Sequence, residues 1–247
     1  MFKNSINFKI IGIYIAAMIG ISVFQIIFII IFPDILDIDA LFIFFSSLSN
    51  LILYLSLFVL FVYFFRNYLK IQFLNFMANK KRYFTIIGAG FLIMLLASVG
   101  SSLILEWLGI TETSANQESL DMLMQGTLFD QISLVIFTVF LVPLVEELVF
   151  RKAVLDLVHI KVKETNNPKI DNIKKVISGI IALTVSSLIF GFIHIMSFDP
   201  EQLLQIIYYA GLGAVLGTAY LVSNKNIFVS ITMHFLLNLF VTLISYS

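Results

Sequence analysis

Two adjacent carboxylates and an arginine stand inside an otherwise apolar stretch, in the run Pro143-Leu-Val-Glu146-Glu147-Leu-Val-Phe-Arg151. Helical residues four apart lie on one face, so Glu147 and Arg151 are predicted to form an ion pair. Glu146 would point about 100° away from that face and is left for another partner. A charged helix end at the membrane surface is the plain alternative. Apolar residues on both sides of the group favour a buried functional site instead.

Two histidines stand in later apolar stretches. One ends the run Phe190-Gly-Phe-Ile-His194, and the other begins His234-Phe-Leu-Leu-Asn238, where the four-residue spacing places an imidazole beside an amide. Taken alone, each histidine could equally be a hydrogen-bonded interior residue or part of a functional site. Because three separate stretches each offer an acid, imidazole or amide group, we expect these groups to line one cavity. The remaining histidine, His159, precedes both in a charged segment, and we expect a structural or surface role for it.

The composition is that of a protein dissolved in lipid. Of 247 residues, 60% are hydrophobic and 12% charged, and the mean hydropathy is +1.03, whereas soluble domains carry about 25% charged residues. The formal net charge is zero, so no nucleic-acid partner is expected. The absence of cysteine excludes disulfides, thiolate nucleophiles and cysteine-ligated metals.

The apolar residues form about seven stretches that are each long enough to cross a membrane, which takes roughly 20 residues. The predicted spans are Phe8–Phe32, Ala40–Phe65, Tyr83–Leu108, Leu128–Phe150 and beyond, Val176–Met196, Leu203–Val222 and Ile227–Ser245. The predicted fold is therefore an all-α, polytopic helical membrane protein. No cleavage site follows the first stretch, which indicates a retained span and not a removable signal peptide.

Basic and acidic residues fall at opposite ends of these spans. Lysine and arginine occur within 3–9, 66–82 and 152–175 and at Lys225, which are alternate span ends. The other ends carry only acidic charges: Asp34, Asp37, Asp39, Glu106, Glu112, Glu118, Asp121, Asp130, Asp199 and Glu201. By the positive-inside rule we expect a cytosolic N-terminus and, after seven spans, an external C-terminus.

Smaller segments carry their own predictions. The basic segment Lys70–Arg82 is either a short amphipathic helix on the inner leaflet or a plain loop, and the external loop Thr111–Thr127 is expected to be partly helical. Glycines and alanines between Ala210 and Ala219 predict close packing of the sixth span against another helix. We expect the chain to divide into residues 1–127, with three spans and the external loop, and 128–247, a core of four spans that holds the acid, imidazole and amide groups.

The depths in the membrane that we expect for the polar groups differ, which disfavours a shared cavity. Glu146 and His234 are expected in the inner halves of their spans, whereas His194 lies about 18 residues from the inner end of its own. The three side chains meet only if the fifth helix is tilted or extends well into the cytosol, or if Pro143 displaces the fourth.

Together these residues resemble the CAAX protease and bacteriocin-processing family of intramembrane proteases, also called CPBP or Abi proteins. The family pattern has Glu-Glu-x-x-x-Arg, Phe-x-x-x-His and His-x-x-x-Asn or Asp on successive helices. In the same order, this chain has Glu146, Glu147 and Arg151, then Phe190 and His194, then His234 and Asn238. The resemblance covers about residues 129–240, and the first three spans show nothing diagnostic.

The resemblance and the chemistry of these groups imply a role for each. A carboxylate in an apolar pocket is a stronger base, so Glu146 would activate a water that His194 also holds. His234 and Asn238 would donate hydrogen bonds to the tetrahedral oxyanion, where a donor is worth about 3 kcal/mol. The implied supporting residues are Glu147, Arg151 and Phe190. Arg151 is also a candidate to bind a substrate carboxylate.

A metal-dependent chemistry would use the same residues. Two histidines and a carboxylate suit a Zn²⁺ site with one open position for water, so Glu146, His194 and His234 are also candidate metal ligands. The sequence leaves both chemistries open, with Zn²⁺ as the one cofactor it suggests. The metal-free arrangement is favoured because Asn238 is a poor Zn²⁺ ligand but a good amide donor.

The predicted function is an intramembrane endopeptidase that hydrolyses membrane-associated peptides or proteins within the lipid bilayer. The alternative is a non-catalytic bacteriocin-immunity or regulatory protein that binds a peptide or protein partner. A small transporter with a buried proton relay is disfavoured, because the later spans show no matching broken-helix repeats. The richness in Phe, Ile, Lys and Asn indicates an AT-rich bacterial genome, which favours a bacterial plasma membrane and a non-prenylated substrate.

Overall fold

The computed structural model describes residues 3–110, 113–159, 165, 167–195 and 199–246, and every element within these ranges is helical. Seven helices in this part of the chain are long and apolar enough to cross a membrane. They are α1 (Lys3–Ile31), α2 (Asp39–Ala78), α3 (Lys80–Trp107), the α5–α7 span (Leu128–Val158), α8 (Pro168–Phe192), the α9–α10 span (Pro200–Val222) and α11 (Ile227–Ser245). The predicted all-α, multi-pass membrane fold is confirmed.

Two shorter predictions are settled by local structure. The segment Lys70–Arg82 is helical, because α2 runs to Ala78 and α3 begins at Lys80, so the plain-loop alternative is wrong. In the external loop, α4 (Ala115–Met124) confirms the partial helix, while Thr111 and Glu112 lie outside the described residues. The short helix η1 (Pro33–Asp37) joins α1 to α2.

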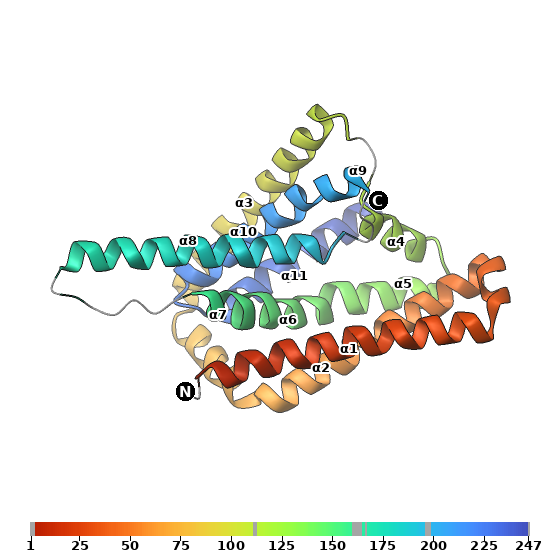
Figure 1. Cartoon of the computed structure of the whole chain (residues 1–247), viewed down its shortest axis with the longest axis horizontal. Helices are drawn as coiled ribbons and strands as arrows, with labels where there is room; N and C mark the ends of the chain where they lie inside the picture. Colours follow the sequence, from red (N-terminus) through yellow and green to blue (C-terminus); the bar gives the residue numbers. More distant parts are fainter. Residues whose placement is uncertain (1–2, 111–112, 160–164, 166, 196–198, 247) are drawn as a thin grey trace.

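The α5–α7 span runs through the middle of the bundle (Figure 1) and has the largest buried share of the seven spans. Helices α1 and α2 pack along one side of it, and α8 and α11 pack along the other. Helix α10 packs on α8, and α3 packs on α10 and α11. The outward faces of these helices carry many exposed Ile, Leu and Phe side chains, as a lipid-facing surface requires.

The central span is not a regular α-helix. It consists of α5 (Leu128–Val135), the π-helix η2 (Ile136–Leu141), α6 (Val142–Glu147), a second π-helix η3 (Leu148–Leu155) and the short α7 (Asp156–Val158). Pro143 is the second residue after η2, and a proline has no N–H to continue an α-helical ladder. Widened turns of this kind occur frequently at functional sites, and here they flank the turn that carries the two adjacent glutamates.

Close packing of α10 on α8 confirms the role predicted for the small residues of the sixth span. A Cβ atom on Gly213 would lie 3.2 Å from the ring of Phe190. One on Gly217 would lie 2.5 Å from a methyl group of Leu183. Gly191 of α8 approaches the backbone of α10 equally closely, so α8 and α10 meet near the end of α8 that precedes His194.

The length of α8 resolves the mismatch in depth expected from the sequence. The helix begins at Pro168, about two turns before the predicted Val176, and this end projects beyond the end of the central span in Figure 1. Its other end brings His194 to Glu146, with 3.9 Å between Nε2 and Oε2. An extended fifth helix was one of the arrangements that the sequence allowed.

The charged ends of the helices sort as the sequence predicted. The start of α1, the α2–α3 junction and α7 lie toward one end of the bundle, and α4, α9 (Pro200–Leu204) and the C-terminus lie toward the other (Figure 1). The basic ends of the spans are therefore on one side. A cytosolic N-terminus stays a prediction from this charge asymmetry.

Candidate active site

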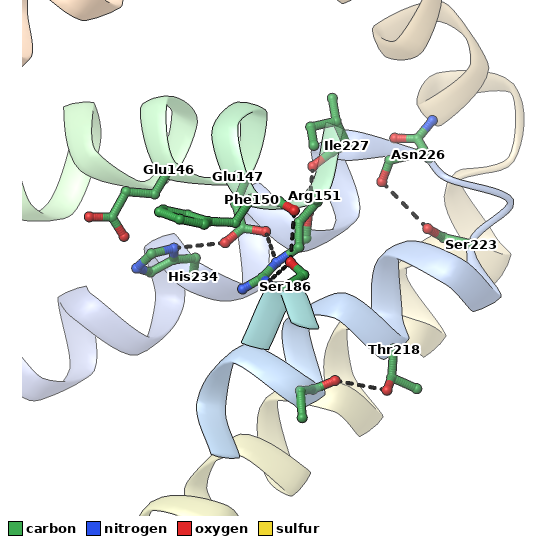
Figure 2. A network of polar contacts seen from close by, with 12 residues as sticks. Glu146, Glu147, Phe150, Arg151, Ser186, Thr218, Ser223, Asn226, Ile227 and His234 are labelled. Atoms are coloured by element: carbon green, nitrogen blue, oxygen red, sulfur yellow. Dashed lines mark hydrogen bonds and ion pairs between the residues drawn. The ribbon is translucent and has the colours of Figure 1, made fainter. Parts of the chain in front are cut away.

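Glu147, at the end of α6, contacts two basic side chains deep in the bundle. Nε of Arg151 donates to its Oε2 at 3.0 Å, and Nδ1 of His234 lies 3.1 Å from its Oε1 (Figure 2). Both Glu147 and Arg151 are fully buried, so the predicted ion pair is confirmed. A carboxylate paired with arginine only accepts hydrogen bonds, so the proton in the contact with His234 belongs to Nδ1.

Arg151 is fixed from several sides. Its Nη1 donates to Oγ of Ser186 at 3.3 Å, and that hydroxyl donates to the carbonyl of Phe150 at 2.8 Å. The guanidinium carbon also lies 5.0 Å from the ring centre of Phe190. Arg151 does not line the cavity described below. Its position suits the ordering of the site and not the binding of a substrate carboxylate.

Glu146 points away from this pair, as the helical spacing predicted (Figure 2). The residue is 3% exposed, and its Oε2 has no hydrogen-bond partner among the described residues. The nearest basic atom is Nε2 of His194, at 3.9 Å, which is longer than a direct hydrogen bond.

His194 lies in the turn that follows α8. Its Nδ1 is 2.7 Å from the carbonyl oxygen of Phe190, and because a carbonyl only accepts, Nδ1 carries the hydrogen. Nε2 therefore presents a lone pair toward Glu146. The rings of Phe190 and Tyr209 lie 4.5 and 4.6 Å from the imidazole, centre to centre, so both aromatic residues hold it in place.

Asn238 lies one turn after His234 in α11, as the spacing predicted, and its Nδ2 donates to the carbonyl of Thr138 at 2.7 Å. In η2 the N–H of Val142 bonds the carbonyl five residues earlier. The same pattern would pair the Thr138 carbonyl with residue 143, which is a proline and has no N–H. Pro143 thus leaves an acceptor that the Asn238 amide satisfies, which ties α11 to the central span.

One cavity of about 230 Å³ brings the predicted groups together. Glu146, His194, His234, Asn238 and Phe190 all line it, while the buried Glu147–Arg151 pair lies behind this wall. The cavity extends from these groups to α4 and to the C-terminal part of α11. No lysine or arginine of the described residues is among its lining.

Several residues that line the cavity were not foreseen. Asn50 and Tyr54 come from α2, Asn116 and Gln117 from α4, and Tyr209 from α10. A polar Asn50 inside an apolar span was a usable signal, because such residues are costly in lipid. The α4 residues carried no such signal, since they belong to a polar loop.

His159 has the structural role that the sequence favoured. It lies just beyond the central span, where its Nδ1 is 3.4 Å from Nζ of Lys225, and Lys225 also bonds Asp156 at 2.7 Å. Partial burial, together with the charge of Lys225, lowers the pKa of His159. The cluster lies outside the cavity lining.

The donor groups do not form a ready metal site. Among the described residues, no group of three His, Asp or Glu side chains is arranged to hold one metal ion. The candidate ligand atoms Oε2 of Glu146 and Nε2 of His194 lie 3.9 Å apart, but the described residues bring no third His, Asp or Glu side chain into one coordination shell with them. The residues therefore do not fit a preformed Zn²⁺ centre.

Comparison with known proteins matches the later part of the chain to a protein family. The family described as type II CAAX prenyl endopeptidase Rce1-like matches residues 128–240, which contain all three motifs and rather less than half of the chain. No curated protein and no solved structure matches the chain. The match supports a membrane-embedded CAAX-type endopeptidase and includes every group of the predicted site. Over residues 128–240, the resemblance of this chain to the CAAX protease family is therefore confirmed.

Proposed function

We propose that the chain is a CAAX/Abi-type intramembrane endopeptidase that hydrolyses membrane-associated peptides or proteins with a water held between Glu146 and His194. The observation that carries this proposal is the 3.9 Å between Oε2 of Glu146 and Nε2 of His194 at the cavity wall. Both atoms are acceptors, so they do not bond each other. Their separation is that of two acceptors bridged by one water, which would lie about 2.8 Å from each and donate one hydrogen to each.

The chemistry follows from these two acceptors. Glu146 takes a proton from the water while the water oxygen attacks the carbonyl carbon of the peptide bond. The C–N bond then breaks as that proton reaches the leaving nitrogen by way of Nε2 of His194. The products are a carboxylic acid, which keeps the second hydrogen of the water, and an amine, and Glu146 is returned to its ionised form.

The oxyanion would be stabilised from α11. Since Glu147 occupies Nδ1 of His234, the other ring nitrogen is the one available to the cavity, and a protonated His234 donates from it. Asn238 keeps one of its two amide N–H groups for the same oxygen, and each such donor is worth about 3 kcal/mol. With His234 protonated, two positive and two negative side chains lie together, so their charges cancel and the cost of burying them in a membrane is limited. The negative side chains are Glu146 and Glu147, and the positive ones are Arg151 and His234.

The cavity favours an uncharged peptide segment as substrate. A free C-terminal carboxylate would find no lysine or arginine among the described lining residues. Apart from the catalytic groups, the polar lining consists of amides and hydroxyls, such as Asn116 and Gln117 of α4. We therefore propose cleavage within the chain of a non-prenylated peptide or membrane protein, entering at the α4 end, in a bacterial plasma membrane.

The proposal is tested in cells that carry the wild type, Glu146→Ala or His194→Ala at equal membrane levels. Mass spectrometry of membrane peptides should show uncut substrate accumulating in both variants but not in the wild type. Glu201→Gln, which changes an exposed carboxylate of α9, is the control and should match the wild type. Identical peptide profiles for the wild type and Glu146→Ala would instead favour a non-catalytic binding protein.

A further inference from the structure

Tyr209 of α10 (Ile206–Val222) packs flat against the imidazole of His194. The two ring centres are 4.6 Å apart and the ring planes differ by 21°. Tyr209 is 9% exposed, so the stacked arrangement is largely closed to solvent and lipid. With Phe190 contributing both its ring and its carbonyl oxygen, His194 is restrained by contacts from α8 and α10 together.

The hydroxyl of Tyr209 is bound at the start of α4. It lies 2.6 Å from Oγ of Ser114, and Nδ2 of Asn116 donates to it at 3.3 Å. The same Ser114 oxygen caps α4 by accepting from the N–H of Gln117 at 3.1 Å. Gln202 of α9 bonds the N–H of Ala115 at 2.9 Å, which fixes this end of α4 to the bundle.

From these contacts we propose that Tyr209 is a positioning residue, which holds His194 with Nε2 facing Glu146 and links that orientation to the start of α4. An imidazole without a stacked neighbour can rotate about its side-chain bonds and can exchange the proton between its two nitrogens. The ring of Tyr209 restricts that rotation, and the hydroxyl fixes the ring. The catalytic consequence rests on the proposed function, but the orientation of His194 does not.

Nitrogen NMR of the histidines in the full-length protein, in lipid nanodiscs, tests the orientation directly. The chain has three histidines, so labelling their rings with ¹⁵N gives few signals, and His194→Gln identifies the signals of His194. In the wild type, His194 should show protonated Nδ1 and unprotonated Nε2. Tyr209→Leu should give a mixture of both tautomers. Tyr209→Phe keeps the ring but loses the hydroxyl that fixes it, so it should show a smaller share of the second tautomer.

Kinetics with a quenched fluorogenic peptide of uncharged, mainly leucine and alanine residues gives a second readout. Tyr209→Leu should lower kcat about tenfold with KM within about twofold, because the loss is one of orientation. Tyr209→Phe keeps the ring but loses the hydroxyl that fixes it, so it should lower kcat by a smaller factor, about threefold. The control is Tyr83→Phe, which removes a buried hydroxyl that bonds Asn75, outside the cavity.

Each outcome decides one of the two proposals. A single, unchanged His194 tautomer in Tyr209→Leu would overturn the positioning role, whatever the peptidase assay gives. A wild type that cleaves neither the probe nor cellular peptides would overturn the proposed function, while the tautomer comparison would still decide the role of Tyr209. If Tyr209→Leu does not fold, as judged by its thermal melting, Tyr209→Met takes its place with the same expected mixture.

Discussion

The parts of the chain before and after residue 128 line the same cavity with different chemistry. Residues 128–240 supply its carboxylate and imidazole groups and the amide proposed as an oxyanion donor, and these are the residues that match the endopeptidase family. Helices α2 and α4 supply only uncharged walls. The difference suggests that the later helices perform the reaction and the earlier ones select the substrate. The two parts pack as one bundle, with α1 against η3 and α3 against α10, so the division at 127/128 is proposed for function only.

The largest expected effect comes from breaking the buried pair behind the reaction groups. Glu147→Ala leaves the fully buried Arg151 without its carboxylate, which should cost about 3–5 kcal/mol of folding free energy and abolish activity. Thermal unfolding in detergent measures the loss. The double variant Glu147→Gln with Arg151→Met should recover stability but not activity. Recovery of activity as well would show that the pair has no part in ordering the site.

Removing the imidazole that holds the proposed water should abolish most activity without harming the fold. For His194→Ala we expect a fall in kcat of about 10³-fold, within the range for general acid–base groups, because Glu146 alone cannot orient the water. The melting temperature should stay within a few degrees of the wild type, since His194 is half-buried at a helix end. A kcat within tenfold of the wild type would contradict the assignment.

Removing the proposed second oxyanion donor should have a smaller effect. Asn238→Leu should lower kcat about 10²-fold with little change in KM, as expected for a bond that forms in the transition state. Asn238→Asp is the informative companion, because it keeps the size of the side chain and removes the amide. If kcat/KM instead falls about 10²-fold because KM rises while kcat is unchanged, Asn238 contributes to substrate binding and not to the transition state.

The cavity-lining residues of α2, which precede residue 128, should affect substrate binding and not the rate of the chemical step. Asn50→Leu should change KM for uncharged peptides about three- to tenfold and leave kcat within about threefold. Tyr63→Leu, on the lipid-exposed surface of the same helix, is the control and should change neither. A large fall in kcat for Asn50→Leu would mean that the earlier helices take part in the reaction.

The smallest expected effect is that of metal removal. Because the described residues form no three-ligand cluster, dialysis against a chelator should leave peptidase activity within about twofold of the untreated protein. Metal analysis of the purified protein checks the same point. A stoichiometric metal, whose removal abolishes activity and whose return restores it, would replace the water-activating role proposed for Glu146 and His194.

Contacts within one helix were predictable from the sequence. The pairing of Glu147 with Arg151 and the alignment of His234 with Asn238 follow from residues four apart sharing a helix face. The early start of α8 was also readable, because Asn167 caps it by accepting from the N–H of Lys169 at 3.1 Å, directly before a proline.

Contacts between helices could not be predicted from the sequence alone. The bond from His234 to Glu147 joins residues 87 apart, and the stacking of Tyr209 on His194 joins α10 to the end of α8. Both depend on how the helices pack, which helical periodicity does not determine. The π-helical turns on either side of Glu146 likewise arise from the surroundings of the central span, although Pro143 marked one of them.

The central claim is that the carboxylate of Glu146 activates the water, and its most direct test is the activity of Glu146→Gln. This variant keeps the shape of the side chain and removes the base. In nanodiscs, with the uncharged fluorogenic peptide as substrate, kcat should fall about 10³-fold or more while the melting temperature stays that of the wild type. Glu201→Gln should keep full activity in the same assay. Glu146→Gln retaining more than about a tenth of wild-type activity would contradict the account.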